Sequence, residues 1–162
     1  MKEKEYMRLE SDSIGTMEVP EDAYYGVQAL RAKENFPITG TKLHPVFIKN
    51  LAKIKRAAAI TNRKAGRLKP EIANAIEASA NEVICGMFDK DFIVDGIQGG
   101  AGTSANMNMN EVIANRAIEM LCGKKGDYTI VHPNDHVNMA QSTNDVIPTA
   151  GKLTVLDLLK PL

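Results

Sequence analysis

The sequence predicts a mostly α-helical protein, with a short extended element near its start and the first turns of a central bundle helix at its end. Apolar residues recur at helical spacing through several long segments, and Pro, Ser or Thr stands where those segments begin. Gly follows most of them. The 162 residues are enough for one domain with a real core, and we find no internal repeat, low-complexity segment or linker.

The segment from Arg8 to Pro20 is predicted to be extended. It mixes Gly and Pro with short alternating apolar stretches, which is typical of a small hairpin or an extended arm. A short helix is expected next, over residues 23–32. Acidic residues at 21–22 would occupy its first turn, and Pro37 must end it.

Two longer helices are predicted to form an antiparallel pair. In residues 45–64, apolar side chains repeat at helical spacing and Gly66 follows as a C-terminal signal. The basic residues of this segment, Lys55 among them, fall mostly outside the apolar stripe. Residues 70–86 form the second helix, with a proline at the first position and a glycine at the end.

A third strong helix follows a glycine-rich polar loop, residues 99–104, and stops at Gly123. Its methionines are expected to fill a core. Residues 128–131 are apolar and are expected to be extended. A second polar loop, residues 132–136, then leads towards a last helix that contains Pro148 near its first turns.

The last helix is apolar over a wide arc, and only Lys152, Asp157 and Lys160 form a narrow polar side. It ends at Leu162 without a glycine cap or a following partner. We therefore expect the chain to be the front piece of a longer polypeptide, cut within or near a bundle helix. A natural stop or bend at Pro161 is the alternative.

Composition excludes several classes of function. Basic and acidic residues number 20 each, without a basic stripe interleaved with aromatics, so we expect no nucleic-acid partner. No segment approaches the roughly eighteen apolar residues of a membrane span, and the charged N-terminus lacks the apolar core of a signal peptide. The two cysteines, Cys85 and Cys122, have no close-spaced partner. We expect buried, reduced thiols in a cytoplasmic protein.

The two polar loops are the candidate functional feature. Ser142 and Thr143 are favourable N-cap residues for the last helix, and Thr103 and Ser104 stand at the start of the third. The free N–H groups and the positive dipole end of a helix start favour anions. If the loops meet, their uncharged donors form a site for a small carboxylate. Capping alone is the ordinary, structural role of such residues.

Other chemistry fits these loops less well. The glycine-rich loop lacks the Lys of a P-loop and the spacing of a dinucleotide fingerprint. His132, Asp135 and His136 match no metal motif, and an Asx-rich loop that satisfies its own backbone explains them as well. Neither loop has the nucleophile-elbow pattern. We therefore predict no nucleotide, metal or nucleophile site.

Three segments together resemble the aspartase and class II fumarase superfamily, and the resemblance covers nearly the whole chain. They are Ala23–Gln28 with Arg31-Ala32 and residues 34–36; Gly99–Asn108 with Asn110–Arg116; and His132–Asn138 with Gln141–Asp145. Within the superfamily the details resemble aspartate ammonia-lyases more than fumarases. Fumarases tend to carry Thr-Gly-Ser-Gly-Thr-Gln at 99–104 and a second Ser in place of Thr143.

The resemblance implies the N-terminal domain of this superfamily's fold over residues 1–141, and the first turns of its central helix bundle over 142–162. It also implies an anti elimination, in which L-aspartate loses its amino group and a β-proton to give fumarate and ammonia without an organic cofactor. Donors that hold the β-carboxylate would stabilise the doubly charged aci-carboxylate that forms when the proton leaves.

Carried over by position, Thr103, Ser142 and Thr143 would donate to the β-carboxylate, and Asn144 would contact the α-carboxylate or amino side of the substrate. By the same resemblance, the loop at 132–135 falls where fumarases have an accessory anion site, and Ser104 would support its loop.

The resemblance also implies what this chain does not contain. The family's catalytic base is a Ser on a mobile loop in the later part of the chain, and its active site is assembled from three subunits of a homotetramer. We therefore expect binding residues, no base and no lyase turnover from this chain alone. The alternatives are a class II fumarase or another superfamily lyase and, as a different class, a non-catalytic helical interaction module.

Overall fold

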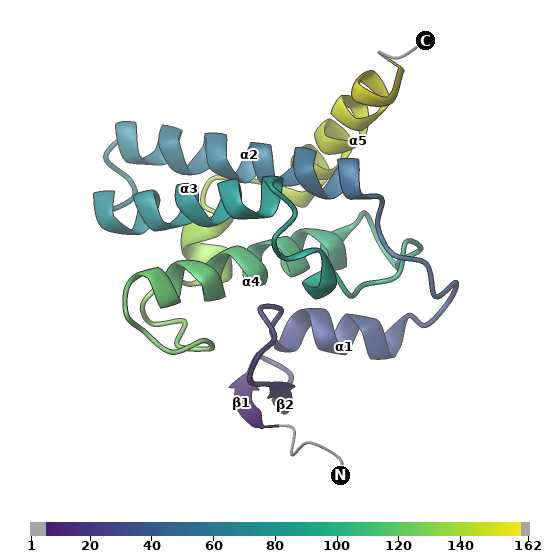
Figure 1. The fold of residues 1–162 in the computed structure, drawn as a ribbon, viewed down its shortest axis with the longest axis horizontal. Coiled ribbons are helices and arrows are strands. Elements are labelled where there is room, and N and C mark those ends of the chain that lie inside the picture. Colours follow the sequence, from purple (N-terminus) through teal and green to yellow (C-terminus); the bar gives the residue numbers. More distant parts are fainter. Residues whose placement is uncertain (1–5, 160–162) are drawn as a thin grey trace.

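A β-hairpin and five α-helices make up the fold in the computed structural model, which describes residues 6–159 (Figure 1). The mostly helical fold class is thereby confirmed. The charged N-terminal segment and the expected chain end at Pro161 and Leu162 lie outside the described residues. Among residues 6–159, no helix is both long and apolar enough to cross a membrane.

The predicted extended segment is a hairpin, one of the two forms expected for it. Strands β1 (Met7–Ser11) and β2 (Thr16–Pro20) pair antiparallel, with Met7 opposite Pro20. In the connecting turn, Asp12 Oδ1 accepts hydrogen bonds from the backbone N–H groups of Ile14 and Gly15 at 2.9 and 3.0 Å. This Asx turn satisfies backbone donors that the sheet leaves free.

Helix α1 (Val27–Asn35) begins four residues later than the sequence predicts. The acidic residues at 21–22 do not lie in its first turn, which contains no acidic residue. Gly26 occupies the N-cap position instead. The expectation failed because the free N–H groups of this helix are satisfied by carboxylates from other elements, Glu10 and Glu111, and a sequence window does not reveal such partners.

Helices α2 (Pro45–Lys64) and α3 (Pro70–Ile84) lie side by side as the predicted pair (Figure 1). Each has proline at its first position, where no intrahelical N–H partner is lost. Gly66 and Gly86 follow the helix ends with φ values of +68° and +83°, as C-terminal glycines do.

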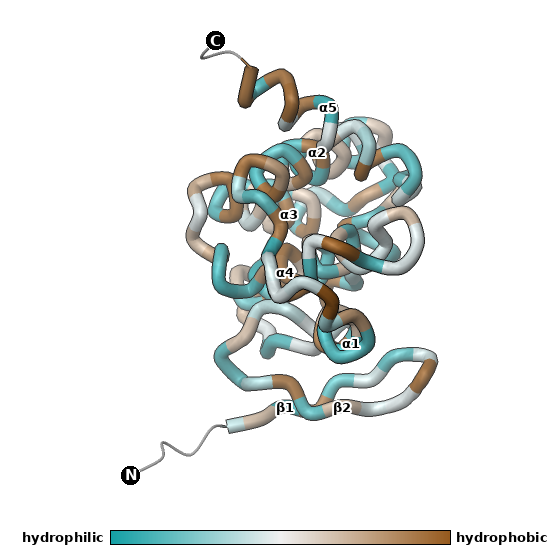
Figure 2. Tube along the Cα trace, turned by 90° about the vertical axis from the view of Figure 1, so that its right-hand side faces the viewer, coloured by the Kyte–Doolittle hydropathy of each residue, from teal (hydrophilic) through white to brown (hydrophobic). Residues whose placement is uncertain are grey.

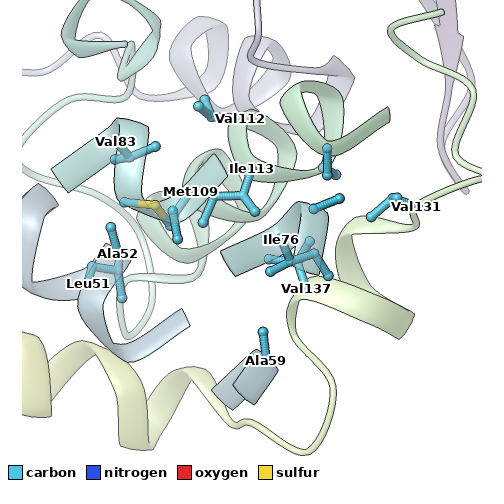
Figure 3. Close-up of a cluster of buried hydrophobic side chains, with 14 of the residues drawn as sticks. Leu51, Ala52, Ala59, Ile76, Val83, Met109, Val112, Ile113, Val131 and Val137 are labelled. Carbon is cyan, nitrogen blue, oxygen red and sulfur yellow. The ribbon is translucent and has the colours of Figure 1, made fainter. Parts of the chain in front are cut away.

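Helix α4 (Thr103–Met120) is the central element of the core. Of the 18 residues of α4, 13 are buried, so the helix is covered on nearly every side and not only along one stripe. Figure 3 shows Met109 and Ile113 of α4 facing Leu51 of α2, Ile76 of α3 and, further along, Val137. A helix buried in this way fixes the positions of the loops at its two ends.

Helix α5 (Thr143–Leu159) follows a turn-rich connection, and the expected extended form of residues 128–131 is wrong. These residues form turns, in which the N–H of Ile130 donates to Asp127 O at 3.1 Å. Residues Pro133–Val137 then form a single π-helical turn, η2. A short 3₁₀ turn, η1 (Asp89–Asp91), lies in the earlier connection between α3 and α4.

The structure corrects the expected burial of two kinds of side chain. Cys85 and Cys122 are free but exposed, because each follows the end of a helix where the chain turns at the surface. Lys55, which the sequence places outside the apolar stripe, is fully buried in α2. Neighbouring Lys53 is exposed as expected.

Candidate functional site

Helix α4 starts directly at the end of the glycine-rich loop. Gly102, the N-cap residue, has φ +86°, a left-handed conformation that glycine adopts without strain. Thr103 is the first helical residue. The cap is supplied by Gln98, whose Oε1 accepts from the N–H of Ala105 at 2.9 Å. The Thr103 hydroxyl therefore has no capping role, and it bonds to no other residue within 6–159.

Ser142 caps helix α5, as its position in the sequence predicts. Its Oγ accepts from the N–H of Asn144 at 3.3 Å, and its carbonyl oxygen accepts from Asp145 and Val146 at 3.0 Å each. A hydroxyl that accepts in this way keeps its own proton for another acceptor. Ser142 can thus cap the helix and donate to a ligand at the same time.

The starts of α4 and α5 lie against each other. Asn106 of α4 donates from Nδ2 to Thr143 Oγ1 at 3.1 Å. A side chain at Gly102 would place its Cβ 2.9 Å from Cγ2 of Ile147, so glycine is needed for this close approach as well as for its φ. The starts of α4 and α5, about forty positions apart in the sequence, thus meet in space.

The sequence-predicted binding residues are accessible at this junction. Thr103, Ser142 and Asn144 are exposed, and Thr143 is half-buried. The positive dipole ends of both helices point towards it, and the first turn of α4 contains no acidic residue. An open surface with three hydroxyls, one amide and two helix starts is suited chemically to a carboxylate. The first turn of α5 adds an exposed carboxylate, that of Asp145.

A cavity of about 480 Å³ lies beside this junction and has a different lining. Ser104, Arg31, His132 and Asn134 contribute to its wall, whereas the four predicted binding residues do not. Arg31 is held by Asp12 through two hydrogen bonds of 3.1 and 3.0 Å. Arg31 therefore lines a pocket whose wall does not include Thr103 or Thr143.

The two histidines of the second loop serve the backbone. His132 Nδ1 accepts from the N–H groups of Asn134 and Asp135 at 3.2 and 3.1 Å, and so caps η2. His136 Nδ1 accepts from the N–H of His132 at 2.9 Å. Burial lowers the pKa of His136, which favours its neutral form. Within residues 6–159, no three side chains of the His, Cys, Asp or Glu types are grouped to hold a metal ion.

Sequence reasoning missed the amides that join the two loops. Asn106 and Asn138 are linked by a hydrogen bond of 3.1 Å from Nδ2 of Asn106 to Oδ1 of Asn138. The available signal was the run Asn106, Asn108 and Asn110 inside an otherwise apolar helix, where all three are buried. Buried amides need partners, so such a run indicates a polar network.

Comparison with known proteins identifies the protein family to which this fold and site belong. The family described as "Lyase" matches residues 15–162, and the chain belongs to this lyase family. Aspartate ammonia-lyase from Bacillus sp is 55% identical over 156 residues, 96% of this chain and 33% of the relative. Class II fumarate hydratase from Halobacterium salinarum is 55% identical over 152 residues, 94% of this chain and 32% of the relative.

The fold comparison agrees with the sequence comparison. The native crystal structure titled "fumarate lyase:delta crystallin" from Brucella melitensis superposes with a TM-score of 0.91 at 50% identity, and covers 93% of this chain and 36% of that chain. The chain thus spans about a third of the length of the relatives it matches.

Proposed function

We propose that this chain supplies part of the substrate-binding site of an aspartate ammonia-lyase, which converts L-aspartate to fumarate and ammonia. The observation that carries the proposal is the junction of two helix starts, where the Asn106–Thr143 hydrogen bond of 3.1 Å joins uncharged side chains of α4 and α5. The names of relatives at 51–55% identity support the aspartate reaction.

In the proposed mechanism, Thr103, Ser142 and Thr143 donate hydrogen bonds to the β-carboxylate of L-aspartate, and Asn144 contacts the α-carboxylate or amino side. Loss of the β-proton places a second negative charge on the β-carboxylate. Donors that strengthen towards this aci-carboxylate lower the barrier more than they tighten substrate binding. Elimination of ammonia from the neighbouring carbon then gives fumarate.

The base that removes the β-proton is proposed to come from other parts of the full-length protein, which we propose to be a cytoplasmic homotetramer. Within residues 6–159, the accessible groups at the junction besides the Asp145 carboxylate, which lies in the first turn of α5, are hydroxyls and amides. These are poor bases at neutral pH, because a hydroxyl needs activation before it can take a proton. We therefore expect no turnover from the 162-residue chain alone.

The test is a fumarate assay of the full-length protein with L-aspartate and with L-malate. Fumarate formation from L-aspartate and not from L-malate supports the proposal. The reverse preference supports the second candidate, a class II fumarase, which the Halobacterium salinarum relative favours. Absence of fumarate with either substrate refutes both and leaves a helical interaction module.

Substitutions at the junction test whether the reaction takes place there. Thr143→Val removes one donor and is expected to lower kcat/KM for L-aspartate about a hundredfold, in line with the loss of one donor to a developing charge. Thr61→Val is the matched control, because Thr61 is exposed on α2 and, within residues 6–159, its hydroxyl bonds only to Ala57 O of its own helix. Equal activity of Thr143→Val and wild type would contradict the proposed role of Thr143.

A further inference from the structure

Lys55 is among the largest of the fully buried side chains within residues 6–159, and it lies in the middle of α2 with 0% exposure. Its Nζ donates to Asn138 Oδ1 at 2.8 Å, and within residues 6–159 it has no other hydrogen-bond partner and no ion pair. Burial lowers the pKa of Lys55 to about 7. An amine held inside a core costs stability that an apolar side chain would not, so packing alone does not explain it.

The side-chain oxygen of Asn138 accepts two hydrogen bonds. Its Oδ1 accepts from Lys55 and, at 3.1 Å, from Nδ2 of Asn106. Its own Nδ2 donates to the carbonyl oxygen of Gln141 at 3.3 Å, within the segment that leads into α5. Asn138 therefore joins the interior of α2 to the residue just before the cap of α5.

Asn106 connects Asn138 to Thr143 at the proposed binding site. The side chain of Asn106 is 1% exposed, and Nδ2 donates to Asn138 and to Thr143 Oγ1, each at 3.1 Å. With both donations made, the orientation of this amide is fixed. Because Thr143 Oγ1 accepts from Asn106, the hydroxyl proton of Thr143 must point away from Asn106, which leaves it free to donate to a ligand.

We propose that Lys55 is a positioning residue for Thr143, acting through Asn138 and Asn106 to hold the Thr143 hydroxyl as a donor to the substrate carboxylate. The inference rests on the proposed function, since it assigns a task to Lys55 in the same site. Lys55 fixes the oxygen of Asn138, that oxygen fixes the amide of Asn106, and the amide fixes the hydroxyl. Hydrogen-bond chains of this kind, inside a core of low dielectric, hold their members more firmly than separate bonds do.

The experiment uses the full-length protein and the variant Lys55→Met, which keeps an unbranched side chain and removes the donor. We expect KM for L-aspartate to rise about tenfold in Lys55→Met. The ratio of the change in kcat to the change in KM should be the same as in Thr143→Val. A purely structural defect lowers the fraction of active protein, which reduces kcat and leaves KM unchanged. Lys64→Met, an exposed change at the end of the same helix, is the control and should match wild type.

A double-mutant cycle then tests the route. If Lys55 acts through Thr143, adding Lys55→Met to Thr143→Val should change kcat/KM by less than about twofold. The reason is that Thr143→Val already lacks the hydroxyl that Lys55 is proposed to position. Effects that multiply, or an unchanged KM in Lys55→Met, would overturn the inference. If Lys55→Met does not assemble, Asn106→Asp replaces it in this test. Asn106→Asp keeps the shape of the side chain but cannot donate a hydrogen bond to Thr143. An unchanged KM in Asn106→Asp would overturn the inference equally.

Failure of the inference and failure of the proposed function give different results. If wild type forms fumarate from L-aspartate and Thr143→Val is impaired, the proposed function stands and the cycle decides on Lys55 alone. If wild type forms no fumarate from either substrate, both are refuted together.

Discussion

The carboxylate of Glu111, on α4, accepts a hydrogen bond from the backbone N–H of Gly26 at 3.0 Å, directly before the first turn of α1. It also accepts from Gln28 at 2.8 Å and from Ala29 at 3.0 Å. Glu10 of the hairpin accepts from the N–H of the next residue along, Val27, at 3.0 Å. Two carboxylates from distant segments thus satisfy the free donors of α1 and fasten the hairpin and α1 to the central helix.

The first prediction concerns Gly26, which has no room for a side chain. A Cβ at this position would lie 2.7 Å from Glu10 Oε2 and 2.8 Å from Glu111 Cδ, and it would also meet the hydroxyl of Tyr128. We expect Gly26→Ala to lower the free energy of unfolding by about 1–3 kcal/mol, the usual cost of overpacking. Chemical denaturation measures this directly.

Gly151→Ala is the matched control. Gly151 lies inside α5, and a Cβ there would meet nothing within 4 Å. Alanine in place of glycine in a helix interior gains roughly 0.5–1 kcal/mol. The two substitutions should therefore have opposite signs, and equal effects would show that the crowding at Gly26 is relieved by movement of its neighbours.

The second prediction is a pH dependence that originates at Glu111. Burial raises the pKa of Glu111 to about 7, although hydrogen bonds from Gln28, Ala29 and Gly26 work in the opposite direction. At pH values between the ordinary pKa of Glu and about 7, the folded state therefore holds a proton on Glu111 that the unfolded state has released. Stability should fall as pH rises through this window, by on the order of 3 kcal/mol from this residue.

Comparing wild type with Glu111→Gln isolates this contribution. The lowered pKa of His136 acts in the opposite sense, because the unfolded state takes up that proton first as pH falls. It acts equally in both proteins and cancels in the difference. Unfolding curves from pH 5 to 8 should give a steeper fall with pH for wild type than for Glu111→Gln, and parallel curves would contradict the assignment.

The third prediction separates stability from function at Lys55. With its pKa lowered to about 7 by burial, the folded state gives up this proton well before the unfolded state does. Stability should therefore rise between about pH 7 and pH 10. Lys55→Met should flatten that rise and leave the protein as stable as wild type at pH 7, or more stable by about 1–3 kcal/mol.

Lys64→Met is again the control, since Lys64 is exposed. The lowered pKa of Lys125 contributes in the same pH range but is common to all three proteins. A loss of stability in Lys55→Met at pH 7 would mean that the hydrogen bond to Asn138 outweighs the cost of burying the amine.

Much of the helical framework was predictable because its signals are local. The bounds of α2 follow from a proline at the start and Gly66 after the end, together with an apolar repeat between them. The capped start of α5 at Ser142 was likewise visible in the sequence. Local signals of this kind depend on residues within one or two turns of each other.

What could not be predicted depends on partners that lie far away in the sequence. The start of α1 is set by Glu111, more than eighty positions later, and the burial of Lys55 is matched by Asn138 at a similar separation. Periodicity assigned Lys55 to a polar side because it weighs only hydrophobicity. The roles of Thr103, Ser142, Thr143 and Asn144 in binding remain predictions that the kinetic tests above address.

The last prediction concerns the outer part of α5. Figure 2 shows apolar residues concentrated where this helix extends beyond the rest of the molecule. Its exposed apolar side chains within residues 6–159 are Leu153, Val155, Leu156, Leu158 and Leu159. An apolar surface of this kind associates in water because burial removes it from solvent. We expect the 162-residue chain to self-associate, with a sedimentation coefficient that rises with protein concentration.

The double variant Leu156→Lys with Leu159→Lys should weaken this association by at least about tenfold, since each change places a charge on the contact surface. Met87→Lys is the control, because Met87 is also exposed and apolar but lies beyond the end of α3. Sedimentation velocity on the three proteins distinguishes the outcomes. A chain that stays monomeric at all concentrations, or a double variant that associates like wild type, would show that the α5 surface is not what drives assembly.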